Sequence, residues 1–141
     1  MEIPAKQLPS IEAAIERYLR DPFWGHADLT RERGLLPLYM GWTGTIFVDG
    51  SGEFWFLDLE DEPGTLRPEN DLRWQIVSLV IGSERHPELQ ALLPQRPEAE
   101  PDCAVCSGTG HAIVSGIEKK NVTCGNCAGL GWVPRELREE P

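Results

Sequence analysis

The four cysteines of this chain lie in two copies of one short pattern. Residues 103–110 read CAVCSGTG and residues 124–131 read CGNCAGLG, so each copy has the form C-x-x-C-x-G-x-G. A two-residue gap lets one tight turn present both sulfurs to a single ion, and two such turns supply the four thiolates that tetrahedral zinc accepts. The pattern therefore predicts one structural zinc ion with four ligands: Cys103, Cys106, Cys124 and Cys127.

Glycines and a short hairpin are expected to position these ligands. The glycines after each second cysteine allow backbone N–H groups to turn toward the sulfurs and offset their charge. Between the repeats, residues 111–114 and 117–122 alternate in polarity around Ser115-Gly116. That arrangement predicts a β-hairpin that brings the two cysteine pairs together.

Two other chemistries remain open for these cysteines, a redox-active dithiol pair and an iron site. Zinc is favoured because the spacing of the two C-x-x-C pairs matches its shell of four thiolates. The last forty or so residues also contain few large apolar side chains, and such a segment usually needs a metal or a disulfide to fold. His111 is interpreted as a strand residue, because four cysteines already fill the coordination shell. With no position left for water, catalytic zinc is not expected.

A second candidate site is an acidic cluster after a predicted strand. It consists of Asp58, Glu60, Asp61 and Glu62. Such a cluster is either a solvated loop or a contact for a basic protein partner. No histidine, cysteine or serine constellation accompanies these carboxylates, so we expect no enzymatic activity.

The first part of the chain contains one amphipathic pattern and one hairpin pattern. Ser10 is expected to cap a helix that ends at Asp21-Pro22. Residues 21–38 are expected to be irregular, with Phe23 and Trp24 as a lid over the core. Residues 42–48 and 53–59 predict a β-hairpin around a turn at residues 49–52, with the second strand central and covered on both faces.

Further helices are predicted after this hairpin. Asn70 or Asp71 can cap a helix with one buried face, which Gly82 is expected to stop. His86-Pro87 opens a short third helix that ends near residues 93–94. Five tryptophans are present, and Trp132 is expected to pack against the cysteine repeats. The other four are expected in the core: Trp24, Trp42, Trp55 and Trp74.

These patterns predict an α+β fold: an antiparallel sheet with flanking helices, followed by a small zinc-knuckle β-hairpin module. The expected divisions are an acidic α+β domain (1–94), a proline-rich linker (95–102), a single-zinc hairpin module (103–133) and a charged tail (134–141).

The net charge of −10 lies entirely in the first part of the chain. Residues 1–102 contain 19 acidic and 9 basic side chains, whereas residues 103–141 contain 4 of each. An acidic surface repels nucleic acid and membranes and attracts basic partners. No apolar run approaches the roughly 18 residues of a membrane span, and residues 1–10 lack a hydrophobic signal core. We therefore expect a cytoplasmic protein with no nucleic-acid or membrane partner.

The two cysteine repeats resemble the cysteine-rich zinc finger of DnaJ-type chaperones. The cysteines and the glycines Gly108, Gly110, Gly129 and Gly131 match that pattern over about thirty residues. The family's full domain has four repeats and two zinc ions, whereas this chain has two repeats and lacks the J-domain. The resemblance implies a one-zinc knuckle hairpin and a role in protein–protein contact.

Residues 9–94 resemble the SUKH superfamily, many of whose bacterial members are immunity proteins that neutralise toxins. The resemblance rests on a helix, a Leu-Pro-containing loop, the segment GWTGTIFVDGSGEFWFLD and a helical end closing with PELQALLP. It implies that the acidic surface imitates nucleic acid for a basic toxin.

Three functions follow as hypotheses. The first is a non-enzymatic, immunity-type protein that binds a basic toxin or effector. The second is a small chaperone-like or assembly adaptor that holds client proteins through the zinc module. The third is a thiol oxidoreductase that uses the C-x-x-C pairs.

Overall fold

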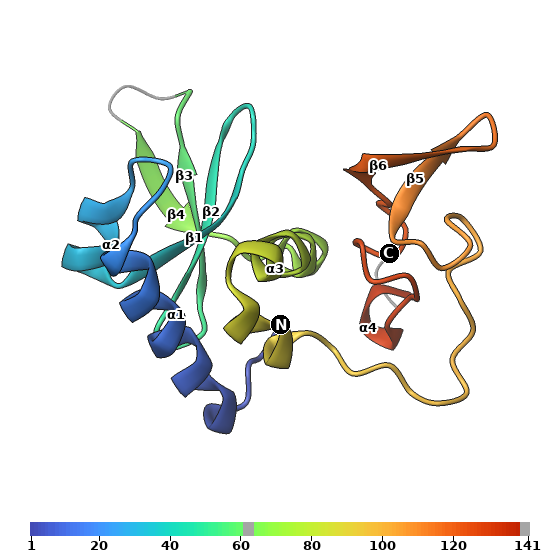
Figure 1. Ribbon diagram of the computed structural model, residues 1–141, viewed down its shortest axis with the longest axis horizontal. Coiled ribbons are helices and arrows are strands. Elements are labelled where there is room, and N and C mark those ends of the chain that lie inside the picture. Colours follow the sequence, from blue (N-terminus) through green and yellow to red (C-terminus); the bar gives the residue numbers. More distant parts are fainter. Residues whose placement is uncertain (61–63, 139–141) are drawn as a thin grey trace.

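The computed structural model of the chain describes residues 1–60 and 64–138. It confirms the α+β class: a four-stranded antiparallel sheet with helices on both faces, followed by a two-stranded hairpin region that carries the cysteines (Figure 1). Among the described residues, no helix combines the length and the apolar character needed to cross a lipid bilayer.

The sheet is an uninterrupted meander in the order β1-β2-β3-β4. Its strands are β1 (Leu35–Met40), β2 (Gly44–Asp49), β3 (Phe54–Asp58) and β4 (Thr65–Pro68). The predicted hairpin of β2 and β3 is confirmed, with Val48 opposite Phe54 and Gly44 opposite Asp58. Its turn is closed by the Asp49 carboxylate, which accepts hydrogen bonds from the backbone N–H groups of Ser51 (2.9 Å) and Glu53 (3.0 Å).

The prediction that the second strand of this hairpin is central and covered on both faces is only partly right. β3 does lie inside the sheet, but most of its side chains are half-buried, whereas β2 is almost wholly buried. The reason is the placement of the helices. α2 (Ala27–Arg33) covers one face over β1 and β2, where His26 packs on Phe47 and Thr30 donates a hydrogen bond to the Leu35 carbonyl.

The other face of the sheet carries the main core. It packs against α1 (Leu8–Arg20), α3 (Leu72–Arg85) and the 3-10 helix η2 (Pro87–Leu92). The buried side chains alternate along the strands and recur on the helices as period 2 and period 3.6 require. They include Ile11, Ile15, Tyr18, Leu36, Leu38, Ile46, Val48, Phe54, Leu79 and Leu89.

Two predictions about the first forty residues are wrong. Helix α1 begins at Leu8, directly after the 3-10 helix η1 (Ala5–Gln7), so Ser10 lies inside its first turn. Pro9 explains this start, because its fixed φ suits the first helical turn. Residues 21–38 are not irregular, since they contain α2 and part of β1. Gly34, in the left-handed conformation, ends α2, and Pro37 is tolerated because β1 is an edge strand with a bulge.

Helix α3 departs from prediction in two respects. Asp71 caps it, as one of the two expected residues, but the helix runs through Gly82 to Arg85. Gly82 is required by packing, since a Cβ there would lie 2.9 Å from Leu38 Cδ2. Helix α3 is also buried on two sides. Leu79 joins the sheet core, while Ile76 and Val77 join a second cluster with Ala128 and Leu137 of the C-terminal region.

Helix α3 therefore lies between the sheet and the cysteine-bearing segment (Figure 1). That segment contains β5 (His111–Val114), β6 (Ile117–Thr123) and the short helix α4 (Arg135–Arg138), and the predicted hairpin is confirmed. The prediction that the four tryptophans other than Trp132 lie in the core is wrong. Trp42 is 104% exposed and Trp74 is 46% exposed, and Trp24 and Trp55 are only half-buried. Only Trp132 is buried.

Candidate functional site

The four cysteine sulfurs converge on one point. They all lie within 4.8 Å of one another and all four residues are buried. Two of the separations join the two repeats, with Cys103 Sγ 4.0 Å from Cys124 Sγ and Cys106 Sγ 3.8 Å from Cys127 Sγ. A tetrahedron with metal–sulfur bonds of about 2.3 Å has edges of about 3.8 Å. The cluster could therefore hold one metal ion.

The two repeats are held together by a reciprocal pair of backbone hydrogen bonds. The N–H of Cys103 donates to the carbonyl of Gly131 (2.8 Å), and the N–H of Cys124 donates to the carbonyl of Gly110 (3.0 Å). Each repeat thus closes on the last glycine of the other. Approximate two-fold symmetry of the site follows directly from the repetition in the sequence.

The final glycines of the repeats are needed for this closure. Gly110 has φ +78° and Gly131 has φ +86°, a conformation that residues with side chains rarely adopt. A Cβ on Gly110 would lie 2.5 Å from the Gly129 carbonyl oxygen, and one on Gly131 would lie 2.7 Å from that of Gly108. Only glycine lets the two backbones approach this closely.

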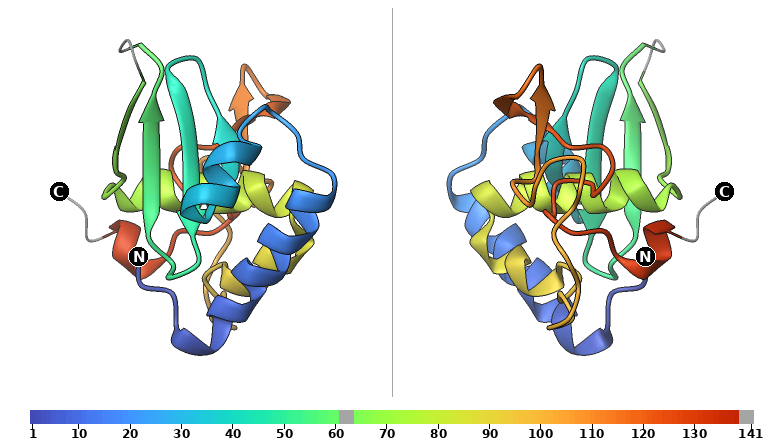
Figure 2. Two further views of the ribbon diagram at one scale, coloured as in Figure 1. Left: turned by 90° about the vertical axis from the view of Figure 1, so that its left-hand side faces the viewer. Right: turned by 90° about the vertical axis from the view of Figure 1, so that its right-hand side faces the viewer.

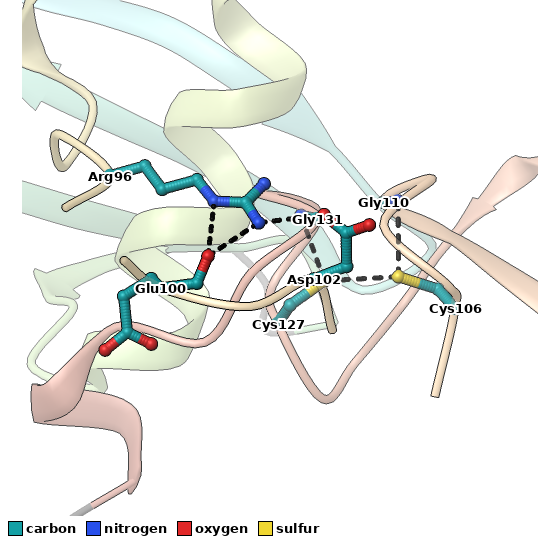
Figure 3. A network of polar contacts seen from close by, with 7 residues as sticks. All are labelled: Arg96, Glu100, Asp102, Cys106, Gly110, Cys127 and Gly131. Atoms are coloured by element: carbon teal, nitrogen blue, oxygen red, sulfur yellow. Dashed lines mark hydrogen bonds and ion pairs between the residues drawn. The ribbon is translucent and has the colours of Figure 1, made fainter. Parts of the chain in front are cut away.

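The same glycines also supply charge compensation for the sulfurs. The N–H of Gly110 donates to Cys106 Sγ and the N–H of Gly131 donates to Cys127 Sγ, both at 3.3 Å (Figure 3). The side-chain amide of Asn126 donates to Cys103 Sγ at 3.4 Å. Such donors stabilise thiolates and orient them as ligands.

The four thiols cannot all ionise easily by themselves. Burial raises the pKa of Cys124, and it raises the pKa of Cys127 to about 12. Burial opposes ionisation of Cys103 too, but hydrogen bonds, led by that from Asn126, outweigh it and lower the pKa of Cys103 to about 6. A cation at the centre would offset the charge of four adjacent thiolates, so the donor set suits a metal ion.

The second repeat is anchored to α3, and the segment before the first repeat is held by contacts within itself. Arg73 of α3 donates to the backbone carbonyls of Gly125 and Asn126 in the second repeat. In the preceding segment, Arg96 pairs with Asp102 (2.8 Å), next to the first repeat, and donates to the carbonyl of Glu100 (2.9 Å), as Figure 3 shows. The segment predicted as a linker is therefore fixed by its own contacts.

His111 is a strand residue, as predicted. It begins β5, and its Nδ1 lies 2.9 Å from Glu118 Oε1 on the neighbouring strand. It is absent from the group of described side chains whose ligand atoms converge.

The predicted acidic cluster lies at the end of β3, but its members differ in role. The Asp58 carboxylate is engaged within the fold, accepting from the Glu60 N–H (3.0 Å) and pairing with Arg67 (3.2 Å). Glu60 is exposed. Asp61 and Glu62 lie outside the described residues.

An aromatic surface beside this cluster was not predicted from the sequence. A groove of about 480 Å³ runs along the end of the sheet, lined by aromatic residues that include Tyr39, Trp42, Phe56 and Trp74. Trp42 lies in the tight connection Gly41-Trp42-Thr43-Gly44 between β1 and β2. The sequence could have predicted an exposed Trp42, because a tight turn between two glycines has no core in which a large aromatic side chain could be buried.

Comparisons of the chain with protein-family models, with curated proteins and with solved structures found no match. The resemblances to the DnaJ-type zinc finger and to SUKH proteins therefore stay predictions.

Proposed function

We propose that this chain is a non-enzymatic protein-binding protein of the immunity type, which binds a basic toxin or effector with the acidic end of its sheet. The observation that carries the proposal is that acidic and large apolar side chains are exposed together at that end. Glu60 and the fully exposed Trp42 line one groove there, and Leu59, which directly precedes Glu60, is 49% exposed. Exposed aromatic groups next to charged ones are typical of protein interfaces. The overall charge of −10 favours a basic partner over nucleic acid or a membrane.

We propose zinc as the ion of the cysteine cluster, in a structural role. Zinc has no geometric preference of its own and accepts four thiolates in a tetrahedron. The buried sulfurs leave no side open for a substrate, which argues against both a catalytic ion and a dithiol that exchanges with disulfides. A reducing compartment keeps such thiols available for metal, so the proposed location is the cytoplasm.

Two of the three histidines, His26 and His86, give no support to an enzymatic role. His26 lies 3.2 Å from Thr45 Oγ1, but Thr45 is fully buried and cannot meet a substrate. His86 is buried against the Pro37 carbonyl. Neither arrangement offers an accessible nucleophile with an adjacent base.

The experiment is affinity capture from the native host with the wild-type chain, Glu60→Lys and Glu98→Lys, each washed at low and high salt. Both variants change the net charge equally, but Glu98 is an exposed residue of the segment that precedes the cysteines. The proposal expects one basic partner that is retained by the wild type and by Glu98→Lys, weakened by Glu60→Lys, and lost at high salt. A partner affected equally by both variants would contradict it.

A second function, a chaperone-like or assembly adaptor, is favoured by one specific observation. The β5–β6 hairpin exposes the apolar side chains of Val114, Ile117 and Val122, each by at least 50%. Such a patch suits apolar client segments. In the same capture experiment, a range of salt-resistant clients that are lost in Ile117→Asp would favour this function instead.

A further inference from the structure

The groove at the end of the sheet has the composition of a site for one cationic side chain. It runs between the β1–β2 turn, the end of β3 and the start of α3, and it is lined by aromatic rings and by carboxylates, including Glu60 and Glu69. The β1–β2 turn and the end of β3 lie at the same end of the molecule (Figure 2), where the Leu59 N–H donates to the Thr43 carbonyl (2.8 Å).

The aromatic lining is open to solvent. Trp42 exposes its entire side chain, and Trp74 remains 46% exposed although its ring stacks on that of Tyr39, with centroids 6.2 Å apart and planes at 27°. The stacking holds Trp74 in a fixed orientation, so its outer face is a preformed platform. Exposed tryptophans of this kind contribute strongly when a partner covers them.

The groove already contains one cation bound in the manner that we infer. The Arg67 guanidinium lies over the Phe56 ring, with Cζ 5.1 Å from the centroid, and pairs with Asp58 at 3.2 Å. An aromatic face and a carboxylate together hold this arginine.

Two further carboxylates of the groove have no such cation. Within residues 1–60 and 64–138, no hydrogen bond or ion pair engages the side chains of Glu60 and Glu69. Trp42 and Trp74 therefore provide ring faces, and Glu60 and Glu69 provide charge, for a cation that comes from outside.

We propose that this groove binds an arginine side chain presented by an exposed loop of the basic partner. The planar guanidinium stacks on an indole face while its N–H groups donate to a carboxylate, much as Arg67 lies over the Phe56 ring and pairs with Asp58. This inference rests on the proposed function, because it names the group by which a basic protein would be recognised.

The probe is an octapeptide of alternating glycine and arginine, compared with the same peptide carrying neutral citrulline at each arginine. Citrulline keeps the shape and removes the charge. Binding is followed by NMR on the indole N–H signals of the zinc-loaded full chain. We expect the arginine peptide to shift the signals of Trp42 and Trp74 but not that of buried Trp132, and the citrulline peptide to shift none.

Two variants test whether the arginine peptide binds at the groove. Trp42→Ala should weaken binding of the arginine peptide at least fivefold, whereas Ile117→Ala, which removes an exposed apolar side chain from the β5–β6 hairpin, should leave it unchanged. Because both residues are exposed, neither change endangers folding, and circular dichroism verifies this. Equal binding of the citrulline peptide, or unchanged affinity in Trp42→Ala, would overturn the inference.

The two proposals can fail separately. If Glu60→Lys abolishes capture of the partner while Trp42→Ala changes neither capture nor peptide binding, the immunity-type function stands and the arginine groove does not. If a peptide of alternating glycine and leucine shifts Trp42 and Trp74 as strongly as the arginine peptide does, the groove is an apolar site and the inference is wrong.

Discussion

At the scale of single residues, the last glycine of each repeat decides whether the two halves of the cysteine cluster can meet. Gly110 both donates its N–H to Cys106 Sγ and lies against the Gly129 carbonyl, where no Cβ fits. Gly116, in the β5–β6 turn, has the same φ of +78° but open space around it. Substitutions at Gly110 and Gly116 therefore separate the free-energy cost of a left-handed backbone from the cost of a steric clash with a neighbouring carbonyl.

Gly110→Ala is expected to weaken metal binding roughly 10- to 100-fold, the range typical of changes around metal ligands. Gly116→Ala should lose only the roughly 1–2 kcal/mol that a side chain costs in the left-handed conformation, with metal affinity nearly unchanged. Competition with a chromogenic chelator measures both affinities. Equal losses in the two variants would show that the close approach to Gly129 is unimportant.

A second residue, His86, makes folding stability depend on pH. Its ring is buried, stacks on Phe23 and lies with Nε2 3.0 Å from the Pro37 carbonyl. Burial lowers the pKa of His86 below its usual 6.5, with a smaller contribution from Arg17 and Arg85. The folded state thus holds this imidazole neutral, while the unfolded state protonates it near pH 6.5. The stability from the neutral ring is complete above that pH and is lost as the pH falls through the lowered pKa.

His86→Gln keeps a donor for the Pro37 carbonyl but removes the titration. Urea unfolding at several pH values should show the wild type losing stability relative to the variant below pH 6.5, by at most about 1.4 kcal/mol per pH unit. Protonation of the metal site affects both proteins equally and cancels in the difference. Parallel pH profiles would contradict this account of His86.

At the scale of elements, helix α3 determines how the two parts of the chain meet. One side packs on β1 so closely that Gly82 faces Leu38, and another side receives Ala128 and Leu137 of the C-terminal region. Such a helix must be apolar on more than one stripe, which its sequence does show at Ile76, Val77 and Leu79.

Gly82→Ala tests this close packing. Alanine is a better helix former by about 1 kcal/mol, yet its Cβ would lie within 3.2 Å of the Cα of Leu38 as well as of its side chain. We expect a net destabilisation of roughly 1–2 kcal/mol, because overpacking outweighs propensity. Glu84→Ala, on the exposed side of the same helix, should stay within about 0.5 kcal/mol of the wild type in denaturant unfolding. Stabilisation by Gly82→Ala would show that α3 and β1 lie further apart.

The elements also show how far the sequence can predict such a fold. The β2–β3 hairpin, the β5–β6 hairpin and the convergence of the four cysteines were predictable, because each depends on a local pattern. The roles of Pro37, Gly82 and Trp42 were not predicted, since each depends on its neighbours in space. Proline and glycine usually end elements, but here Pro37 lies in an edge strand and Gly82 inside a helix. Tryptophan is usually buried, and Trp42 extends from a turn that has no core beneath it.

At the scale of the whole molecule, the cysteine cluster and the sheet lie on opposite sides of α3. The second cluster of buried residues joins Ile76 and Val77 to Ala128, directly beside Cys127. The metal is therefore expected to support the helix as well as its own segment. The division of the chain at residues 95–102 stays a prediction. It is tested by measuring how far the loss of structure extends beyond residues 103–133 when metal is removed.

Removal of metal by a chelator, followed by hydrogen exchange, measures this propagation. Amides of residues 103–133 should lose protection, those of α3 should lose part of theirs, and those of β2 and β3 should remain protected, because the sheet core does not include the cysteine segment. Restoring one equivalent of zinc is the control and should restore protection. An unchanged α3 would mean that the two parts fold independently.

The explanation of residues 103–133 depends on whether the cysteine cluster binds a metal ion. The most direct test is mass spectrometry of the intact protein under non-denaturing conditions. The wild-type chain and Cys103→Ser are compared, both purified without added metal. We predict that the wild-type chain carries one zinc ion bound by four thiolates, and that the variant has lost this ion. A mass that corresponds to two disulfides, to an iron centre, or to a fully reduced chain without metal would contradict it.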